Sequence, residues 1–265
     1  MTLSAYVSGL GVLGPGLSNW PEAAAVLSGQ RAYRPAAAVL PMPAILAAAE
    51  RRRIGRVVKL ALAIALEATS QAGEDPAELA SVFSSSGGDG HNCHELCQAL
   101  SLAGREISPT RFANSVHNAA AGYWSIGTGA TAESNVLCAF DASFTAGLLE
   151  ALTQVVVDQV PVLLVAYDSE YPQPLHAKRP IPDTFGVAMV LTPQRRVPSF
   201  ARVDAALSDL ECDRFADPDL EALRCAFPAA RALPLLRLLA ARTGGTATLE
   251  YLDVSRLEVR IEPCA

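Results

Sequence analysis

Short apolar runs and longer segments of helical spacing alternate along most of the chain. Five runs bounded by Gly, Pro or polar residues predict strands at residues 5–10, 81–86, 135–138, 160–166 and 185–191. Apolar residues three and four apart predict helices at residues 20–29, 57–71, 118–126 and 142–157, with a further helix ending near Leu102. Because strands alternate with helices, the pattern predicts an α/β fold built on a mainly parallel sheet.

The last third of the chain has a weaker pattern. Residues 220–227 and 233–242 have helical spacing, and residues 246–251 and 256–261 alternate like the two strands of a terminal hairpin. The stretches 31–50 and 167–184 are rich in proline and contain no clear element. We expect no regular structure over 167–184 and leave the path of this segment open.

The composition indicates a globular protein with a large core. Of 265 residues, 51% are hydrophobic and 18% are charged. The formal net charge of −6 argues against nucleic acid as a partner, since such binders usually carry a basic face. A local exception is the group Arg51, Arg52, Arg53 and Arg56. It is equally typical of a basic docking patch and of a solvated helix start.

The cysteines and the N-terminus bear on where the protein works. Six cysteines, at positions 93, 97, 138, 212, 225 and 264, lack the paired density of a small secreted scaffold. We expect reduced thiols and a cytoplasmic protein. No basic leader precedes the first apolar run, and no later segment reaches the length of a membrane helix by inspection, so we expect no membrane insertion.

Several segments, taken in chain order, resemble the β-ketoacyl synthase family. They are residues 7–16, the basic and alanine-rich stretch 51–68, the Ser86-Gly87-Gly88 turn, and residues 107–112, 118–122, 137–147 and 185–191. The resemblance implies a thiolase-type fold, in which two similar α/β halves stack into α-β-α-β-α layers and the protein dimerises. Residues 1–196 would form a complete first half, and residues 197–265 a shortened second half.

The family's condensation chemistry depends on a cysteine delivered by a strand to a helix N-terminus, where the dipole and nearby amides activate the thiol. Cys138 is the candidate here. However, counting back from Gly147 by the family's usual interval places the nucleophile at Ala139. Phe140 and Asp141 replace the small residues usual at this turn, and we expect them to crowd it and to raise the pKa of a nearby thiol.

The family also takes two histidines and a lysine from its second half. The last histidine here is His176 and the last lysine is Lys178, both before that half. The chain alone therefore lacks the groups that stabilise the enolate. The sequence identifies no catalytic residue, and Cys138 is the candidate at the nucleophile position.

A ketosynthase half without this machinery is similar to the chain-length factors of type II polyketide and aryl polyene synthesis. The resemblance implies a heterodimer with a full-length ketosynthase, an acyl carrier protein docked on the Arg51–Arg56 patch, and no cofactor. His91, Cys93, His94, Cys97 and Phe140 would line the acyl tunnel or the partner interface. Two alternatives stay open: an independent acyltransferase using Cys138, and a scaffold that binds an acyl carrier without any ketosynthase.

Two histidine-containing segments have competing interpretations. His91, Cys93, His94 and Cys97 are dense in metal ligands, but zinc-finger spacing and a second ligand pair are missing, so we predict a buried thiol pair and no metal. His117 lies between Ser115 and Asn118 without an acidic partner. We predict that it bonds the backbone near a helix start rather than forming a catalytic triad.

Overall fold

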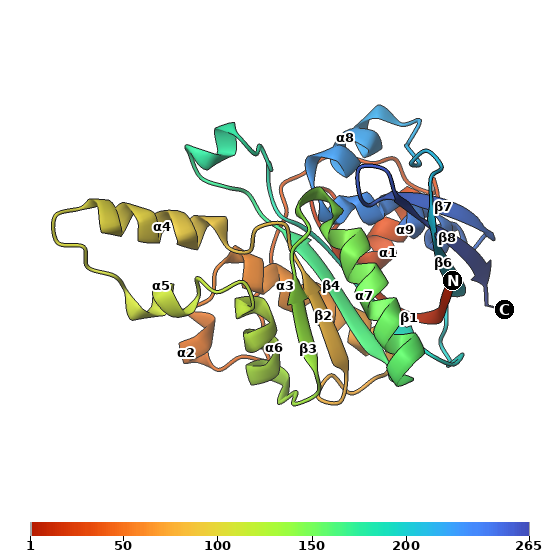
Figure 1. Cartoon of the computed structure of the whole chain (residues 1–265), viewed down its shortest axis with the longest axis horizontal. Coiled ribbons are helices and arrows are strands. Elements are labelled where there is room, and N and C mark those ends of the chain that lie inside the picture. The colour runs from red at the N-terminus through yellow and green to blue at the C-terminus, as the bar shows by residue number, and fades with distance from the viewer. Residues whose placement is uncertain (1, 265) are drawn as a thin grey trace.

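One mixed sheet with helices on both faces organises the chain, as the computed structural model shows for residues 2–264 (Figure 1). The strand order is β3-β2-β4-β5-β1-β6-β8-β7. The strands are β1 (Leu3–Leu13), β2 (Ala80–Ser84), β3 (Ser134–Leu137), β4 (Val162–Asp168), β5 (Phe185–Thr192), β6 (Ala201–Ser208), β7 (Gly245–Glu250) and β8 (Arg256–Pro263).

Helices occupy most of the predicted positions. They are α1 (Trp20–Leu27), α2 (Ala48–Arg51), α3 (Arg56–Ala72), α4 (Gly90–Ser101), α5 (Pro109–Ala113), α6 (Ala119–Thr128), α7 (Ser143–Asp158), α8 (Pro218–Ala226) and α9 (Leu233–Ala241). Short 3-10 turns add η1 (Phe140–Ala142), η2 (Leu175–Ala177) and η3 (Ala229–Ala232). The short helices α2 and α5 were not predicted.

The expectation of a mainly parallel sheet was wrong. Only β2 pairs in parallel, with β3 on one side and β4 on the other. The other five of the seven strand pairs are antiparallel. One reason is that β4 leads into β5 without an intervening α-helix, so the chain reverses direction there. Strands β5 and β6 then flank β1, and both run antiparallel to it.

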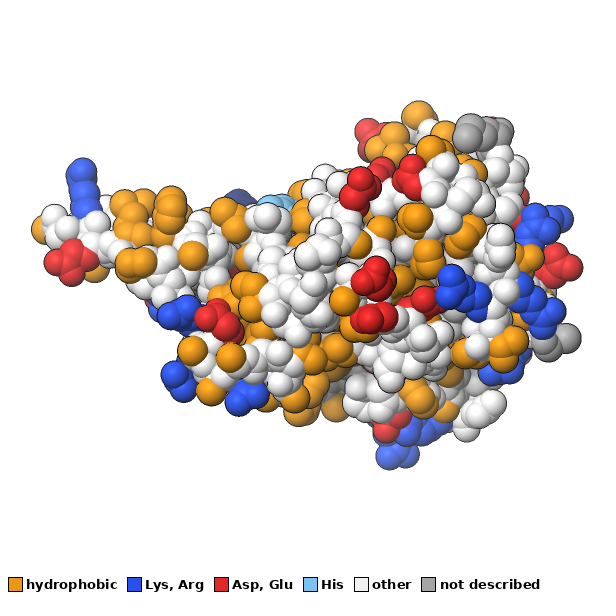
Figure 2. All heavy atoms as spheres, turned by 90° about the horizontal axis from the view of Figure 1, so that it is seen from below, with side chains coloured by type: hydrophobic (Ala, Val, Ile, Leu, Met, Phe, Trp, Pro, Cys, Tyr) orange, Lys and Arg blue, Asp and Glu red, His pale blue; other side chains and the backbone are white. Residues whose placement is uncertain are grey.

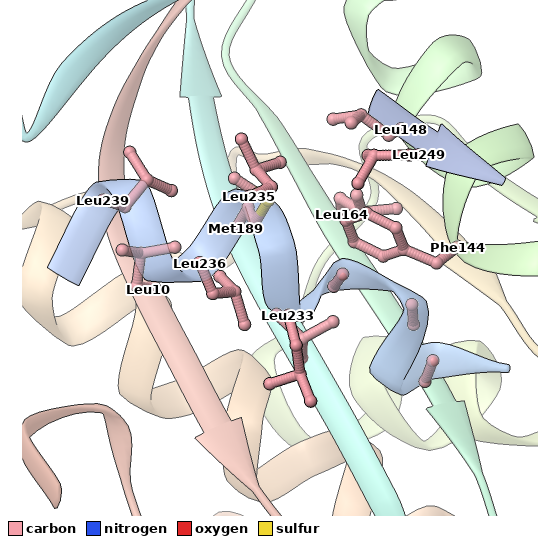
Figure 3. Packing of buried hydrophobic residues seen from close by; sticks show 14 of the residues in the cluster. Leu10, Phe144, Leu148, Leu164, Met189, Leu233, Leu235, Leu236, Leu239 and Leu249 are labelled. Atoms are coloured by element: carbon pink, nitrogen blue, oxygen red, sulfur yellow. The ribbon is translucent and has the colours of Figure 1, made fainter. Parts of the chain in front are cut away.

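The central strands are buried on both faces, as the apolar run at 160–166 predicted. Two cores lie on the two faces of the sheet. Along β4, Val162, Leu164 and Ala166 face the first core, beneath α1, α7 and α9. Leu163 and Val165 face the second core, beneath α3 and α6. Figure 3 shows the first core, in which leucines of α9 lie close to Leu10 of β1 and Met189 of β5. The two cores fix helices to both faces of the sheet.

Helix α3 lies unusually close to β1. A bulge between Val7 and Gly9 changes the phase of the strand and turns Gly9 and Gly11 toward the helix. A Cβ at Gly9 would stand 2.0 Å from the carbonyl oxygen of Ala68, and one at Gly11 would stand 2.1 Å from that of Ile64. Glycine is therefore required by the close approach of two backbones.

Side chains of α3 complete the hydrogen bonding of β1. On its β6 side the strand has ladder partners only up to Val7. Beyond that point the Leu10 amide donates to Gln71 Oε1 at 2.8 Å, and the Val12 amide donates to Glu67 Oε2 at 3.1 Å. The other carboxylate oxygen of Glu67 accepts from the Trp20 amide at 2.6 Å. The helix thus substitutes for a missing strand.

The C-terminal region extends the same sheet rather than forming a separate layer. Strands β6, β8 and β7 follow β1 in antiparallel order, while α8, η3 and α9 join the first core. The hairpin β7–β8 was predicted, but β6 was not, because Arg202 and Asp204 interrupt its apolar positions. The division at residue 196 stays a prediction.

Helix α7 and the turn before it form a long apolar stretch. One stretch among residues 2–264, Phe140–Asp158, is long and apolar enough by length and composition to cross a membrane, so the expectation that none reaches that length was wrong. Phe144, Leu148, Leu152 and Val155 on this helix are buried in the first core. A core helix meets the same test of length and composition.

Helices α4 and α5 form an arm that extends away from the body (Figure 1). Every residue from 101 to 110 is exposed. Hydrophobic side chains are visible along this projection in Figure 2. Exposed apolar residues here and on the neighbouring α6 are Leu100, Leu102, Ile107, Phe112, Val116 and Ile126. So many apolar side chains on one projection are typical of a surface that a partner covers.

Candidate functional site

The carboxyl ends of three strands form the candidate site. Strands β2, β3 and β4 run in parallel, so the segments that follow them meet at one edge of the sheet. These segments are the Ser86-Gly87-Gly88 turn after β2, Cys138 and Phe140 after β3, and Asp168 at the end of β4. The residues predicted for the nucleophile turn therefore do lie beside the Ser-Gly-Gly turn.

The Asp168 carboxylate accepts hydrogen bonds from two segments at this edge of the sheet. Its Oδ1 accepts the amide of Ser86 at 2.9 Å and the Ser86 hydroxyl, and its Oδ2 accepts the amide of Ala229 at 2.9 Å. The side chain is only 2% exposed, and burial raises its pKa to about 6 against the opposing effect of these hydrogen bonds. One carboxylate thus joins the turn after β2 to the C-terminal region.

Gly87 of the turn and Gly90 at the start of α4 make room for Tyr171. A Cβ at Gly87 would stand 1.9 Å from the Tyr171 hydroxyl oxygen, and one at Gly90 would stand 2.0 Å from the ring. Tyr171 is 8% exposed and belongs to the first core. Glycine is therefore needed at these two positions because the Tyr171 side chain packs directly against them.

The sharp turn from β3 into α7 presents Phe140. This residue has a φ of 52°, a left-handed conformation that is rare for a bulky side chain. It stands between the end of β3 and the start of α7, which is where a strained strand-to-helix turn displays its residue. The ring is 62% exposed. The residue displayed by the turn is thus a phenylalanine, which has no nucleophilic atom.

Cys138 lies two residues before this position. Its thiol donates to the Ser86 carbonyl at 3.2 Å, so the sulfur is engaged with the neighbouring turn. The amide of Ala139 donates to Ser143 Oγ at 3.1 Å, and that hydroxyl in turn donates to the Phe140 carbonyl at 2.7 Å. The Ala139 amide is therefore satisfied within the turn and is not free to stabilise an oxyanion.

Arg179 covers one face of the Phe140 ring. Its guanidinium carbon lies 3.9 Å from the ring centroid, and its Nη2 pairs with Asp141 Oδ1 at 2.8 Å. The Arg179 side chain is only 17% exposed although it comes from the proline-rich segment between β4 and β5. Sequence reasoning missed this residue, because no motif links position 179 to position 140.

The predicted tunnel residues lie on the arm. His91, Cys93 and Cys97 are exposed on α4, and His94 is half-buried. The prediction of a buried thiol pair was therefore wrong, because α4 leaves the body instead of packing on the sheet. The two thiols do face each other, and burial together with the nearby Cys97 raises the pKa of Cys93. Within residues 2–264, no three His, Cys, Asp or Glu side chains cluster as metal ligands.

His117 does not act as predicted. Both ring nitrogens are buried and have no hydrogen-bond partner among the described residues. The expectation that it bonds the backbone near the helix start was therefore wrong. Tyr123 and Trp124 of the following helix α6 are buried in the second core.

Two of the four arginines of the basic patch are neutralised. Arg53 pairs with Glu50 at 3.0 Å, and Arg56 pairs with Glu170 and Asp183 at 2.8 Å each. Arg51 and Arg52 have no acidic partner within the part of the chain that the structure describes. Arg52, Arg53 and Arg56 do line a cavity of about 610 Å³ between α2, α3 and the arm.

The two edges of the sheet differ. At the β7 edge, the Asp213 amide donates to the Thr248 carbonyl at 2.9 Å, and the Thr248 amide donates to Asp213 Oδ2 at 2.8 Å. At the β3 edge, Ser134 and Asn135 are exposed, and β3 is the last strand of the order. One edge is thus covered by the chain itself and the other presents a free strand.

A family model identifies the family, and solved structures share the fold. Residues 19–223 match the family described as β-ketoacyl synthase, N-terminal domain. No curated protein matches the chain. A chain from the structure of the ketosynthase ApeO in complex with its chain length factor ApeC, from Xenorhabdus doucetiae, is 23% identical. The match has a TM-score of 0.74 and covers 97% of this chain and 99% of that one.

Two further solved structures share the fold over the whole length. A chain of the ishigamide ketosynthase/chain length factor is 13% identical, with a TM-score of 0.73 and coverage of 99% and 100% of the two chains. A chain of AntDE:AntF, a type II acyl-carrier protein in complex with its ketosynthase, is 10% identical, with a TM-score of 0.74 and full coverage of both. By its sequence match and its fold, this chain belongs to the β-ketoacyl synthase family, as a member of the N-terminal domain group.

Proposed function

We propose that this chain is a non-catalytic subunit of the chain-length-factor type, which pairs with a full-length β-ketoacyl synthase in the cytoplasm and shapes its acyl tunnel. The observation that carries the proposal is the turn after β3. Phe140 occupies the exposed position of this strand-to-helix turn. The thiol of Cys138 instead donates a hydrogen bond to the Ser86 carbonyl. Nucleophilic catalysis needs a thiol at the mouth of the helix, and that place holds an aromatic ring.

The free β3 edge and the arm support a heterodimer. The Glu133 carbonyl accepts the amide of Ser81 in β2, so the next residue, Ser134, directs its own N–H away from β2. An extended segment of a partner can pair there. Helices α4, α5 and α6 lie toward the β3 edge of the sheet (Figure 1). Each of them carries an exposed apolar side chain: Leu100, Phe112 and Ile126. The ketosynthase and chain length factor complexes described above contain a chain with this fold.

In such a complex the arm carries the predicted tunnel residues His91, Cys93, His94 and Cys97. The acyl carrier protein docks at Arg51, Arg52, Arg53 and Arg56. Among residues 2–264, acidic side chains pair with Arg53 and Arg56 but not with Arg51 or Arg52. We therefore expect the carrier contact on this chain to be weak. The product, whether a type II polyketide, an aryl polyene or another fatty-acid-like chain, is decided by the partner together with the tunnel.

A reconstituted complex tests the absence of catalysis. The chain is combined with the complete ketosynthase encoded nearest to it and an acyl carrier, and chain extension is followed by mass spectrometry. Cys138→Ala should leave turnover within about twofold of wild type, as should Cys225→Ala, a matched change at another exposed thiol. Acylation of Cys138 in the isolated chain by an acyl thioester, seen by intact mass, would instead favour the independent acyltransferase.

The edge strand tests the pairing. Ser134→Pro removes an outward N–H at an exposed edge position, where proline is tolerated. We expect it to weaken the complex at least tenfold by size-exclusion or calorimetric titration, while the matched Ser134→Ala leaves assembly unchanged. Wild-type affinity in the proline variant would rule out pairing through β3. Binding of the carrier without any ketosynthase would point to the scaffold alternative.

A further inference from the structure

The two ends of the arm meet at one place on the body. The chain departs at Gly88 and Asp89, just before α4, and comes back at His117, just before α6 (Figure 1). A Cβ at Gly88 would stand 4.0 Å from the Cα of His117, so these two ends lie side by side. Tyr167 of β4 is 1% exposed and lines a small cavity together with both ends.

Three polar side chains that line this cavity have hydrogen-bonding atoms to spare. Both ring nitrogens of His117 are buried and have no partner among the described residues. Within residues 2–264, the Tyr167 hydroxyl makes no hydrogen bond either. Asp89 caps α4 through Oδ1, which accepts the Asn92 amide at 2.9 Å, whereas its Oδ2 accepts no hydrogen bond from the described residues. Because buried polar groups in proteins are nearly always paired, these side chains point to a shared ligand.

The size and the chemistry of the cavity select water as that ligand. A volume of about 10 Å³ is close to the least that one water molecule needs, and it is too small for a phosphate group or an organic molecule. A water molecule can accept hydrogen bonds from the Tyr167 O–H and a His117 N–H and can donate one to Asp89 Oδ2. A total of about three hydrogen bonds is typical of a buried water. A metal ion is a poorer match, since no three His, Cys, Asp or Glu side chains cluster among residues 2–264.

We propose that this cavity is a binding site for one structural water molecule, which joins both ends of the arm to β4 through Asp89, His117 and Tyr167. One direct hydrogen bond supports the same junction, from the Asn114 side chain to the Arg53 carbonyl at 2.7 Å. The water thereby helps to fix the direction in which α4 and α5 leave the body. The inference concerns the chain by itself and does not depend on the proposed function.

A crystal structure of the isolated wild-type chain, at a resolution that shows ordered water, tests the site. We expect one water oxygen about 2.7–3.2 Å from a His117 ring nitrogen, the Tyr167 hydroxyl and an Asp89 oxygen. An imidazole bonded directly to a protein atom, with no water beside it, would overturn the assignment. So would a metal ion, which would lie about 2.1 Å from its ligands.

Amide hydrogen exchange followed by mass spectrometry tests the joining role. His117→Phe keeps a ring but removes both nitrogens, and Tyr167→Phe removes one hydroxyl. In each variant we expect exchange at least about fivefold faster in peptides covering residues 86–96 and 112–120, because loss of a buried hydrogen bond favours local opening. His176→Phe, a matched change in η2 outside the arm, should leave these peptides at the wild-type rate.

The two measurements decide the two parts of the proposal separately. Wild-type exchange at the base of the arm in both variants would refute the joining role, even where the crystal structure shows the water. If His117→Phe does not fold, Tyr167→Phe and the wild-type crystal structure still decide. Faster exchange throughout the protein, including peptides of α7, would indicate general destabilisation and would also count against a role at the arm.

Discussion

Removal of the Glu67 carboxylate should destabilise the protein more than loss of any ordinary surface residue of α3. The carboxylate accepts the amides of Val12 and Trp20, at 3.1 and 2.6 Å, and both of these residues are buried. In Glu67→Ala both amides lose their acceptor. Each buried unsatisfied donor costs about 1–3 kcal/mol, so the expected loss in the free energy of unfolding is about 2–6 kcal/mol.

The matched variants divide this loss into its parts. Glu67→Gln keeps one acceptor oxygen but turns an NH₂ group toward the second amide, so we expect about half the effect of the alanine variant. Ser70→Ala changes an exposed residue of the same helix and should stay within about 0.5 kcal/mol of wild type. Urea unfolding followed by tryptophan fluorescence measures all three. A decrease of less than about 1 kcal/mol in the free energy of unfolding of Glu67→Ala would refute the idea that the Glu67 carboxylate replaces strand partners of these amides.

Three further predictions concern close approach, burial and ion pairing. Gly9→Ala places a Cβ 2.0 Å from a backbone oxygen of Ala68, so we expect a loss of about 3 kcal/mol or more, or insoluble protein, in thermal unfolding. Asp168 has a folded pKa of about 6 against an ordinary 3.8, so its protonated form is favoured on folding, and this contribution, about 3 kcal/mol, is lost as pH rises from 4 to 6. Asp168→Asn should flatten that decline in urea midpoints measured from pH 4 to 7, and an unchanged slope would contradict the assignment. The hydrogen bond from Arg224 lowers the pKa of Glu221 to about 2, so in Arg224→Gln the Glu221 pKa should move back toward 4.5 in an NMR titration.

Most helices and the central strands could be predicted because their apolar positions in the sequence are the positions buried in the core. The predicted helix 57–71 differs from α3 by one residue at each end, since its apolar stripe is continuous and Gly73 ends it. Strand β1 was predicted to end near Leu10 but continues to Leu13. The glycines at 9 and 11 looked like chain breaks, whereas in the fold they admit a helix backbone.

The site was only partly predictable. The Ser86-Gly87-Gly88 turn and the region of Cys138 were found from local motifs. Which residue the turn displays depends on where β3 ends and α7 begins, and counting from Gly147 gave Ala139 where the structure has Phe140 in the left-handed conformation. Arg179 and Asp168 gave no sequence signal, because their roles depend on contacts with residues far away along the chain.

The unequal edges of the sheet set a limit on assembly. A strand edge can be regarded as a bonding site, and a sheet with two open edges can add neighbours without end, as fibrils do. Here Asp213 occupies the middle of the β7 edge by bonding both the carbonyl and the amide of Thr248, whereas no strand pairs with the outer side of β3 within residues 2–264. Strand addition is therefore hindered at one edge and free at the other, which favours a pair over a fibril.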